Sequence, residues 1–307
     1  MFSIHPRRVR IVVIGLAVLV LMGLGPRAAS AGGEVPTLDG ETLAGFDAPD
    51  AYQGAAVDKE YLYAINNFRI TKMKKATGEP VLQWDGSGPD GPIIHLDGGV
   101  VVDGRLYCAH SNYPAWPMTS SVEVWEVKDM RHVATHSIGV ANGTLTWIDR
   151  HDGFWWGTFA NYDLVQPGRQ LPHGLTRNTQ LARMDDNFQV LEAWTYPEEL
   201  LKRFQGMSCS GGSWGPDGRL YITGHDLPVA YVMELPGAGS ILKWVAEVNL
   251  PDIAGQGLAW ERDGDGPVLY GVRRNANQVV KMRLPLQQGR PRAGDVGVVR
   301  GPAEMVK

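Results

Sequence analysis

The sequence predicts an all-β protein, built as a five-bladed β-propeller of four-stranded antiparallel blades. The 307 residues include 38 Gly, 20 Pro and 10 Trp, a composition that disfavours a helical bundle or a coiled coil. A unit that starts with an Asp-containing turn recurs five times, at the spacing expected of propeller blades. An N-terminal segment that is first basic and then apolar precedes these repeats.

Each repeat joins a turn to an aliphatic-aromatic or aromatic pair that opens a strand. The turns are Asp58-Lys59, Asp103-Gly104, Asp152-Gly153, Asp217-Gly218 and Asp265-Gly266. The pairs are Leu62-Tyr63, Leu106-Tyr107, Phe154-Trp155, Leu220-Tyr221 and Leu269-Tyr270. Successive turn aspartates are 45, 49, 65 and 48 residues apart, whereas a four-stranded blade occupies about 40 to 50 residues. We therefore predict five blades with all five turns on one face.

Four strands can be assigned within a repeat from short runs rich in Val, Ile, Trp and Tyr. The second repeat gives Gly99–Val102, Leu106–His110, Val122–Val127 and His132–Ile138. The fourth repeat gives Gly211–Trp214, Leu220–Gly224, Ala230–Leu235 and Leu242–Val248. The segment Glu41–Gln53 is expected to close the ring against the C-terminal repeat, because that repeat is short beyond Leu284.

Two additions interrupt the repeats between the third and fourth turns. Residues 161–178 are rich in Pro, Gly and His, and residues 197–205 carry apolar side chains at helical spacing. Long loops on a rigid scaffold often carry function, so these are candidate lids or rim elements; surface decoration is the alternative. Six blades would require a further blade hidden in the first addition.

Residues 1–31 have the order of a signal peptide. Arg7, Arg8 and Arg10 precede an apolar run, and Ala29-Ser30-Ala31 supplies small residues for cleavage. The apolar run is short for a membrane span of about 20 residues, so we expect no stable span after cleavage. The predicted domain is residues 32–307, in a secreted or periplasmic protein. Both the Sec and twin-arginine export routes remain open.

The charge of the mature chain disfavours some partners. Cleavage would remove four arginines and no acidic residue, which reduces 29 basic residues to 25 against 33 acidic ones and gives a formal charge of −8. We therefore expect no nucleic-acid partner. Export would also allow a disulfide between Cys108 and Cys209, although sequence cannot establish their proximity.

Several segments carry a resemblance to known propellers. They are Gln53-Gly54, His95-Leu96-Asp97-Gly98-Gly99, Gly215-Pro216-Asp217-Gly218-Arg219-Leu220-Tyr221 and Gln256-Gly257. Through them the mature chain resembles the secreted quinoprotein-like and NHL-like β-propeller superfamily, and more loosely the five-bladed bacterial glutaminyl cyclotransferases. Such turns occur in many propellers, so the resemblance implies the fold and does not carry over the cyclotransferase's catalytic acid or substrate site.

Every repeat places glycine, closely preceded by a polar residue, where the first strand of a blade begins. The segments are Gln53-Gly54, Asp97-Gly98-Gly99, Asn142-Gly143, Ser210-Gly211-Gly212 and Gln256-Gly257. Glycine permits close backbone approach near the axis of the ring. The polar groups can face the channel, where they bind either a ligand or water. Gln53, Asp97, Asn142 and Gln256 are therefore candidate ligand-binding residues.

The ends of the second strands lie on the same face as the starts of the first. Residues three to five positions after the aromatic residue of each pair should lie at these strand ends. They include His110, Asn112, His225, Asp226 and Arg273, and His95 joins them from an adjoining loop. Such groups on one rim suit acid-base catalysis, a divalent ion or an anionic substrate. We predict His110 and His225 as acid-base residues. Asp226 is predicted either to orient these histidines or to ligate a metal ion, and Arg273 to bind an anion. His95 and Asn112 are further candidate ligand-binding residues.

The predicted function is the binding of a small polar or anionic ligand at the mouth of the channel. Whether the chain is an enzyme stays open, with lactone hydrolysis, cyclisation or another proton transfer as the candidate reactions. The alternative is a non-catalytic module for a peptide, a glycan or an envelope protein, since propellers host both classes. The cofactor is unknown, a divalent metal ion remains open, and a monomer is expected.

Removal of residues 1–31 on export is a direct prediction of the N-terminal sequence. We expect the intact mass and the N-terminal peptide of the exported protein to place its first residue near Gly32. Peptides that contain Phe2 or Ile4 in the exported form would contradict cleavage.

Overall fold

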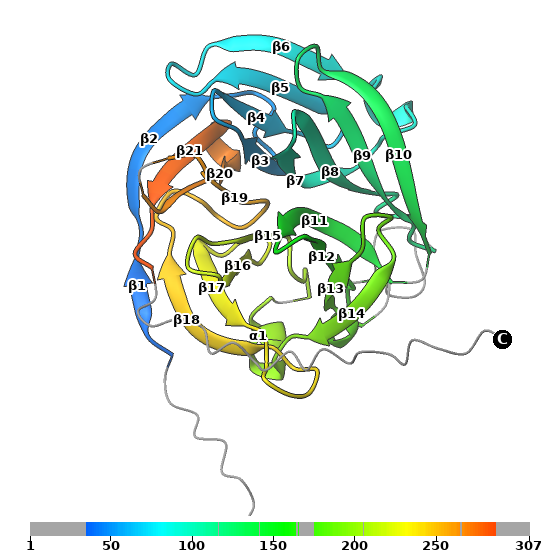
Figure 1. Cartoon of the computed structure of the whole chain (residues 1–307), viewed down its shortest axis with the longest axis vertical. Coiled ribbons are helices and arrows are strands. Elements are labelled where there is room, and N and C mark those ends of the chain that lie inside the picture. The colour runs from blue at the N-terminus through cyan, green and yellow to red at the C-terminus, as the bar shows by residue number, and fades with distance from the viewer. Residues whose placement is uncertain are drawn as a thin grey trace, which may run out of the picture. The chain divides into compact units, whose positions relative to one another are not determined.

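The chain forms a five-bladed β-propeller. A computed structural model describes residues 35–115, 117–140, 142–163, 165, 175–204, 206–264 and 266–286. Five sheets are arranged around a common axis, with the first strand of each innermost (Figure 1). The predicted signal peptide, residue Asp265 and His173 of the first addition lie outside the described residues.

The first three blades are four-stranded antiparallel meanders. The first contains β3 (Gly54–Val57), β4 (Tyr61–Ile65), β5 (Arg69–Lys74) and β6 (Pro80–Asp85). The second contains β7 (Leu96–Val102), β8 (Arg105–Ser111), β9 (Ser120–Glu126) and β10 (Arg131–Gly139). The third contains β11 (Thr144–His151), β12 (Phe154–Ala160), β13 (Gln180–Met184) and β14 (Val190–Thr195).

The last two blades include strands from the N-terminal part of the described chain. The fourth contains β15 (Gly211–Trp214), β16 (Leu220–Thr223), β17 (Val229–Glu234) and β18 (Lys243–Asn249), extended by the parallel strand β1 (Thr37–Asp39). The fifth contains β19 (Ala259–Trp260), β20 (Val268–Arg273), β21 (Gln278–Arg283) and β2 (Glu41–Asp47). Strand β2 pairs antiparallel with β21, which confirms the predicted ring closure. Strand β1 was not expected.

The repeat period therefore predicted the blade count correctly. Asp58, Asp103, Asp152 and Asp217 each lie between the first and second strands of a blade. Turns of neighbouring blades line shared cavities, Asp58 with Asp103 and Asp152 with Gly218, as expected of turns on one face. Strand boundaries in the second and fourth repeats agree with those predicted to within three residues.

Short helical segments occupy the connections. They are the 3-10 turns η1 (Gly88–Asp90), η2 (Thr176–Asn178) and η3 (Arg274–Ala276), and the helix α1 (Glu198–Arg203). Helix α1 lies within the second predicted addition and buries Leu200 and Leu201 against the core between the third and fourth blades. No helix among the residues that the structure describes is long and apolar enough to cross a membrane.

The hydrophobic core is divided among the interfaces between blades. Adjacent residues of β12 show this, because Trp155 packs with Val122 and Phe188 on one side of the sheet while Trp156 packs with Trp214 on the other. Adjacent residues of a strand point to opposite faces of the sheet, and both faces of a propeller blade are covered, so both tryptophans are buried. Cys108 and Cys209 are buried free thiols, so the disulfide left open by the sequence is not formed.

Glycines and one tryptophan close the axis of the ring. A Cβ atom on Gly257 would lie 2.8 Å from the Cα of Gly98 and 3.0 Å from the Cα of Gly54, so three blades meet with no room for a side chain. Trp147 of β11 is buried between Gly98 and Gly212, whose added Cβ would lie 2.4 Å from its indole. This close approach confirms the predicted role for Gly54, Gly98, Gly212 and Gly257, whereas Gly143 of the third repeat lies against Ala160 and Asn161 instead.

Replacing Gly257 by alanine should reduce the free energy of unfolding by about 1–3 kcal/mol, because the new methyl group would press against backbone atoms of Gly54 and Gly98. Urea denaturation measures the change. Gly45→Ala in β2 is the matched control, because its Cβ would meet only the flexible Gln278 side chain, at 3.3 Å. Equal losses in the two variants would contradict the packing constraint at the axis.

Candidate functional site

A cavity of about 500 Å³ lies where the first strands begin, and all five blades contribute to it. One polar residue comes from each blade: Gln53, Asp97, Thr146, Ser210 and Gln256. Loops add further side chains: Tyr52, Asn67, His95, Tyr113, Tyr162, His225 and Arg274. We call this cavity the mouth pocket.

Hydrogen bonds to neighbouring blades and loops orient the polar residues of the mouth pocket. Gln53 Nε2 donates to Asn67 Oδ1 at 2.6 Å, and Gln256 Nε2 donates to the carbonyl oxygen of His225 at 3.2 Å. Thr146 Oγ1 donates to the carbonyl oxygen of Cys209 at 2.9 Å. These side chains are buried, so their hydrogen bonds fix them as a rigid polar lining.

The third blade contributes Thr146 instead of the predicted Asn142. Asn142 lines a different cavity of about 470 Å³ together with Asn161. Strand β11 starts only at Thr144, and a register shift between Leu145 and Trp147 changes which residues face the axis. Thr146 precedes the turn residue Asp152 by the same number of residues as Asp97 precedes the turn residue Asp103. A comparison of these two spacings would have identified Thr146.

Asp97 is the most deeply buried carboxyl group of the mouth pocket. The residue is 3% exposed, and its Oδ2 atom makes no hydrogen bond with any residue that the structure describes. Burial raises the pKa of Asp97 well above its usual value, and the positive charge of Arg274 offsets only part of this rise. Asp97 therefore retains its proton at a pH where ordinary aspartates have lost theirs.

His95 lies beside Asp97, with Nε2 3.6 Å from Asp97 Oδ2. Its ring packs against Tyr113 at a centroid distance of 5.0 Å. Burial, with smaller contributions from His110 and His225, lowers the pKa of His95 to about 4. Burial disfavours both charged forms, so the pKa values of the two groups shift in opposite directions, each towards the neutral form.

His225 lines the mouth pocket as predicted, but Asp226 stands behind it. His225 Nδ1 lies 2.6 Å from Asp226 Oδ1, and Arg274 Nη1 donates to His225 Nε2 at 3.4 Å. Because Nε2 accepts, Nδ1 carries the proton and donates it to the carboxylate. The Asp226 side chain is 74% exposed, which suits an orienting role and places it outside the mouth pocket.

The arginine in the mouth pocket is Arg274, and the predicted Arg273 lies elsewhere. Arg273 ends strand β20 and forms an ion pair with Asp252. Arg274 begins η3, and its guanidinium lies 4.3 Å from the centre of the Tyr52 ring. Arg273 and Arg274 follow Tyr270 of β20 by three and four residues, so position in the repeat alone does not decide which one faces the cavity.

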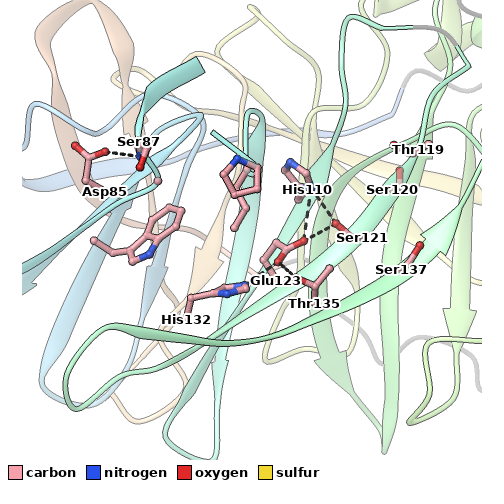
Figure 2. A pocket seen from close by; sticks show the side chains of 14 residues that line it. Asp85, Ser87, His110, Thr119, Ser120, Ser121, Glu123, His132, Thr135 and Ser137 are labelled. Atoms are coloured by element: carbon pink, nitrogen blue, oxygen red, sulfur yellow. Dashed lines mark hydrogen bonds and ion pairs between the residues drawn. The ribbon is translucent and has the colours of Figure 1, made fainter. Parts of the chain in front are cut away.

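His110 faces a separate cavity of about 530 Å³, shown in Figure 2. The N–H of Ile94 donates to His110 Nε2 at 3.2 Å, so Nδ1 carries the proton and donates to Ser121 Oγ at 2.9 Å. Ser121 in turn donates to the buried Glu123, which also accepts from His132 Nε2 at 2.8 Å. Successive side chains of β8 point to opposite faces of the sheet, and His110 points towards the first blade. It therefore does not lie beside His225, although the two histidines occupy similar positions in their repeats.

Asn112 holds its own loop together. Its Nδ2 donates to the carbonyl oxygen of Pro117 at 2.9 Å, and its Oδ1 accepts from the N–H of Thr119 at 2.7 Å. Asn112 is absent from the lining of the mouth pocket. No group of three or more His, Cys, Asp and Glu within the described part of the chain is arranged to hold a metal ion.

One solved structure supports the fold. No family model and no curated protein matches the sequence. The structure is similar to that of Myxococcus xanthus glutaminyl cyclase, with a TM-score of 0.56 and 11% identity over 83% of this chain and 100% of that chain. It also matches a Bacteroides caccae protein of unknown function, with a TM-score of 0.40 and 10% identity over 75% of this chain and 80% of that chain. A chain of the mitotic checkpoint complex matches with a TM-score of 0.42 and 8% identity over 88% of this chain and 99% of that chain. The likeness to the glutaminyl cyclase shows that this chain shares its five-bladed propeller fold.

Proposed function

We propose that the mouth pocket binds a small polar molecule and catalyses proton transfer on it, with Asp97 as general acid and His95 as general base. The proposal rests on the placement of a buried carboxyl group 3.6 Å from a partly buried imidazole in one cavity. A base that accepts a proton must be neutral, and an acid that donates one must be protonated. The opposite pKa shifts of the two groups favour these forms.

The two residues suit a cyclisation or a lactone hydrolysis. As the new bond to the carbonyl carbon forms, His95 takes the proton from the attacking nitrogen or water. As the bond to the leaving group breaks, Asp97 gives its proton to that group. The resulting imidazolium and carboxylate are 3.6 Å apart, so one proton returns from His95 to Asp97 through a bridging water molecule, which restores the starting state.

The polar lining would orient such a substrate. Gln53, Ser210 and Gln256 come from three blades and surround the cavity with amide and hydroxyl groups. The protein with the same fold is named a glutaminyl cyclase, so cyclisation is the first reaction to assay. We further propose that the active form is the exported chain 32–307, on the strength of its basic, apolar and small-residue N-terminal order.

Asp97→Asn and His95→Gln should each reduce turnover by about 10²–10⁴-fold, because each variant removes one partner of the proton transfer. Purified wild type and variants would be incubated with glutaminyl peptides and lactones, and products measured by mass spectrometry. His136→Gln, on the exposed outer strand β10, is the matched control and should retain turnover. Turnover that survives both substitutions would contradict these roles, and absence of wild-type turnover would favour the non-catalytic binding module.

Stability separates a catalytic effect from a structural one. The raised pKa of Asp97 means that its contribution to folding is present at low pH and is lost as pH rises through that pKa. Asparagine cannot ionise, so Asp97→Asn should be at least as stable as wild type at neutral pH.

Turnover should depend on pH with two limits. Activity should fall as pH decreases through about 4, where His95 becomes protonated, and should fall again as pH rises through the elevated pKa of Asp97. Initial rates across this range, measured where circular dichroism shows intact fold, test the assignment. An acid limb near the ordinary histidine pKa of about 6.5 would contradict the role of His95.

A further inference from the structure

Arg274 is a half-buried cation in the mouth pocket whose contacts leave most of its donors free for a ligand. Tyr52 covers one face of the guanidinium at 4.3 Å, and His225 Nε2 accepts from one N–H at 3.4 Å. An arginine side chain has five N–H donors. Among the described residues, no carboxylate lies within ion-pair distance of this guanidinium.

This makes Arg274 unlike most arginines of the protein. The other described arginines that form ion pairs with carboxylates are Arg69, Arg105, Arg131, Arg150, Arg183, Arg203, Arg219, Arg262, Arg273 and Arg283. Arg177 has no such partner either, but it is exposed to solvent. A cation left unpaired inside a cavity of an acidic chain indicates that its counter-ion comes from outside the protein.

The other titratable groups of the mouth pocket do not cancel this charge. Burial shifts the pKa values of His95 and Asp97 towards their neutral forms. His225 accepts from Arg274 through Nε2, and its partner Asp226 lies outside the pocket and is already hydrogen-bonded to it. Among the described residues, Arg274 is the only arginine or lysine in the lining of the mouth pocket, and Asp97 is the only carboxyl group there, so the lining favours an anionic ligand although the whole chain is acidic.

We propose that Arg274 binds a carboxylate group of the small molecule that occupies the mouth pocket. Tyr52 and His225 hold the guanidinium in place, and its planar fork matches the two oxygens of a carboxylate. The inference rests on the proposed function and narrows the substrate class to small carboxylates whose acyl group reaches Asp97 and His95. Phosphate shares the anionic chemistry and is an outcome of the test.

Residue-resolved chemical modification tests the proposal without a known substrate. The mature protein would react with phenylglyoxal, an arginine-selective reagent, and mass spectrometry would follow each arginine separately. Succinate should slow the modification of Arg274 by about tenfold, as expected for charge-assisted hydrogen bonds to one carboxylate. Succinamide, of similar shape but uncharged, should not slow it, and Arg177 is the unpaired, exposed control within the same molecule.

The outcomes decide between the alternatives. Equal protection of Arg274 and Arg177 by succinate, or protection of Arg274 by succinamide, would overturn the proposal, as would no protection at all. Stronger protection by inorganic phosphate than by succinate would overturn the carboxylate assignment. Ligand-observed NMR measures succinate binding directly. Arg274→Gln should weaken this binding by about tenfold. Arg273→Gln is the control, because Arg273 is paired with Asp252, and it should change succinate binding by less than about twofold.

A further variant separates this inference from the proton-transfer proposal. Asp97→Asn should retain the succinate protection of Arg274. If succinate protects Arg274 but turnover does not depend on Asp97, the proton-transfer roles are contradicted and the carboxylate site is retained. Turnover that depends on Asp97, with no protection of Arg274, would contradict the carboxylate site alone.

Discussion

The contact of glycine backbones at the axis is the constraint on which the rest of the structure depends. Gly54, Gly98 and Gly257 approach so closely that a methyl group on any of them would collide with another blade or with Trp147. This approach draws the first strands together and closes the channel with the Trp147 side chain. The mouth pocket lies where these strands begin and is bordered by one polar residue from each blade.

The same closure explains the electrostatics of the mouth pocket. A carboxyl group and an imidazole that sit beside the closed axis lose most of their hydration, and each is shifted towards its neutral form. Fold and chemistry are thus linked through the absence of a side chain at Gly98, the residue that follows Asp97.

The sequence predicted the ring well because turn chemistry repeats with each blade. The repeat phase also predicted correctly that Gln53, Asp97 and Gln256 lie at the mouth of the channel, and ligand binding by them stays a prediction. It was wrong about Asn142, because a register shift in β11 brings Thr146 to the axis instead. The position of a residue within its repeat predicts where it lies along the propeller axis. It does not predict the direction in which the side chain points.

Side-chain direction also explains why His110 and Arg273 lie outside the mouth pocket, where the sequence had predicted them. His110 has the predicted height but points between two blades, where Ser121 and Glu123 engage it. Neighbouring arginines at the end of β20 point to different surroundings, so one pairs with Asp252 and the other enters the mouth pocket. Pairing His95 with Asp97 required the loop conformation, for which the sequence carries no repeat signal.

The protonation states of Asp97 and His95 are the most direct measure of this account. NMR titration of the mature protein, with Asp97→Asn and His95→Gln for assignment, would follow both side chains. We predict a His95 pKa of about 4 and an Asp97 carboxyl group that stays protonated well above its usual range. An ionised Asp97 beside a His95 that titrates with an ordinary pKa of about 6.5 would contradict the neutral acid-base pair.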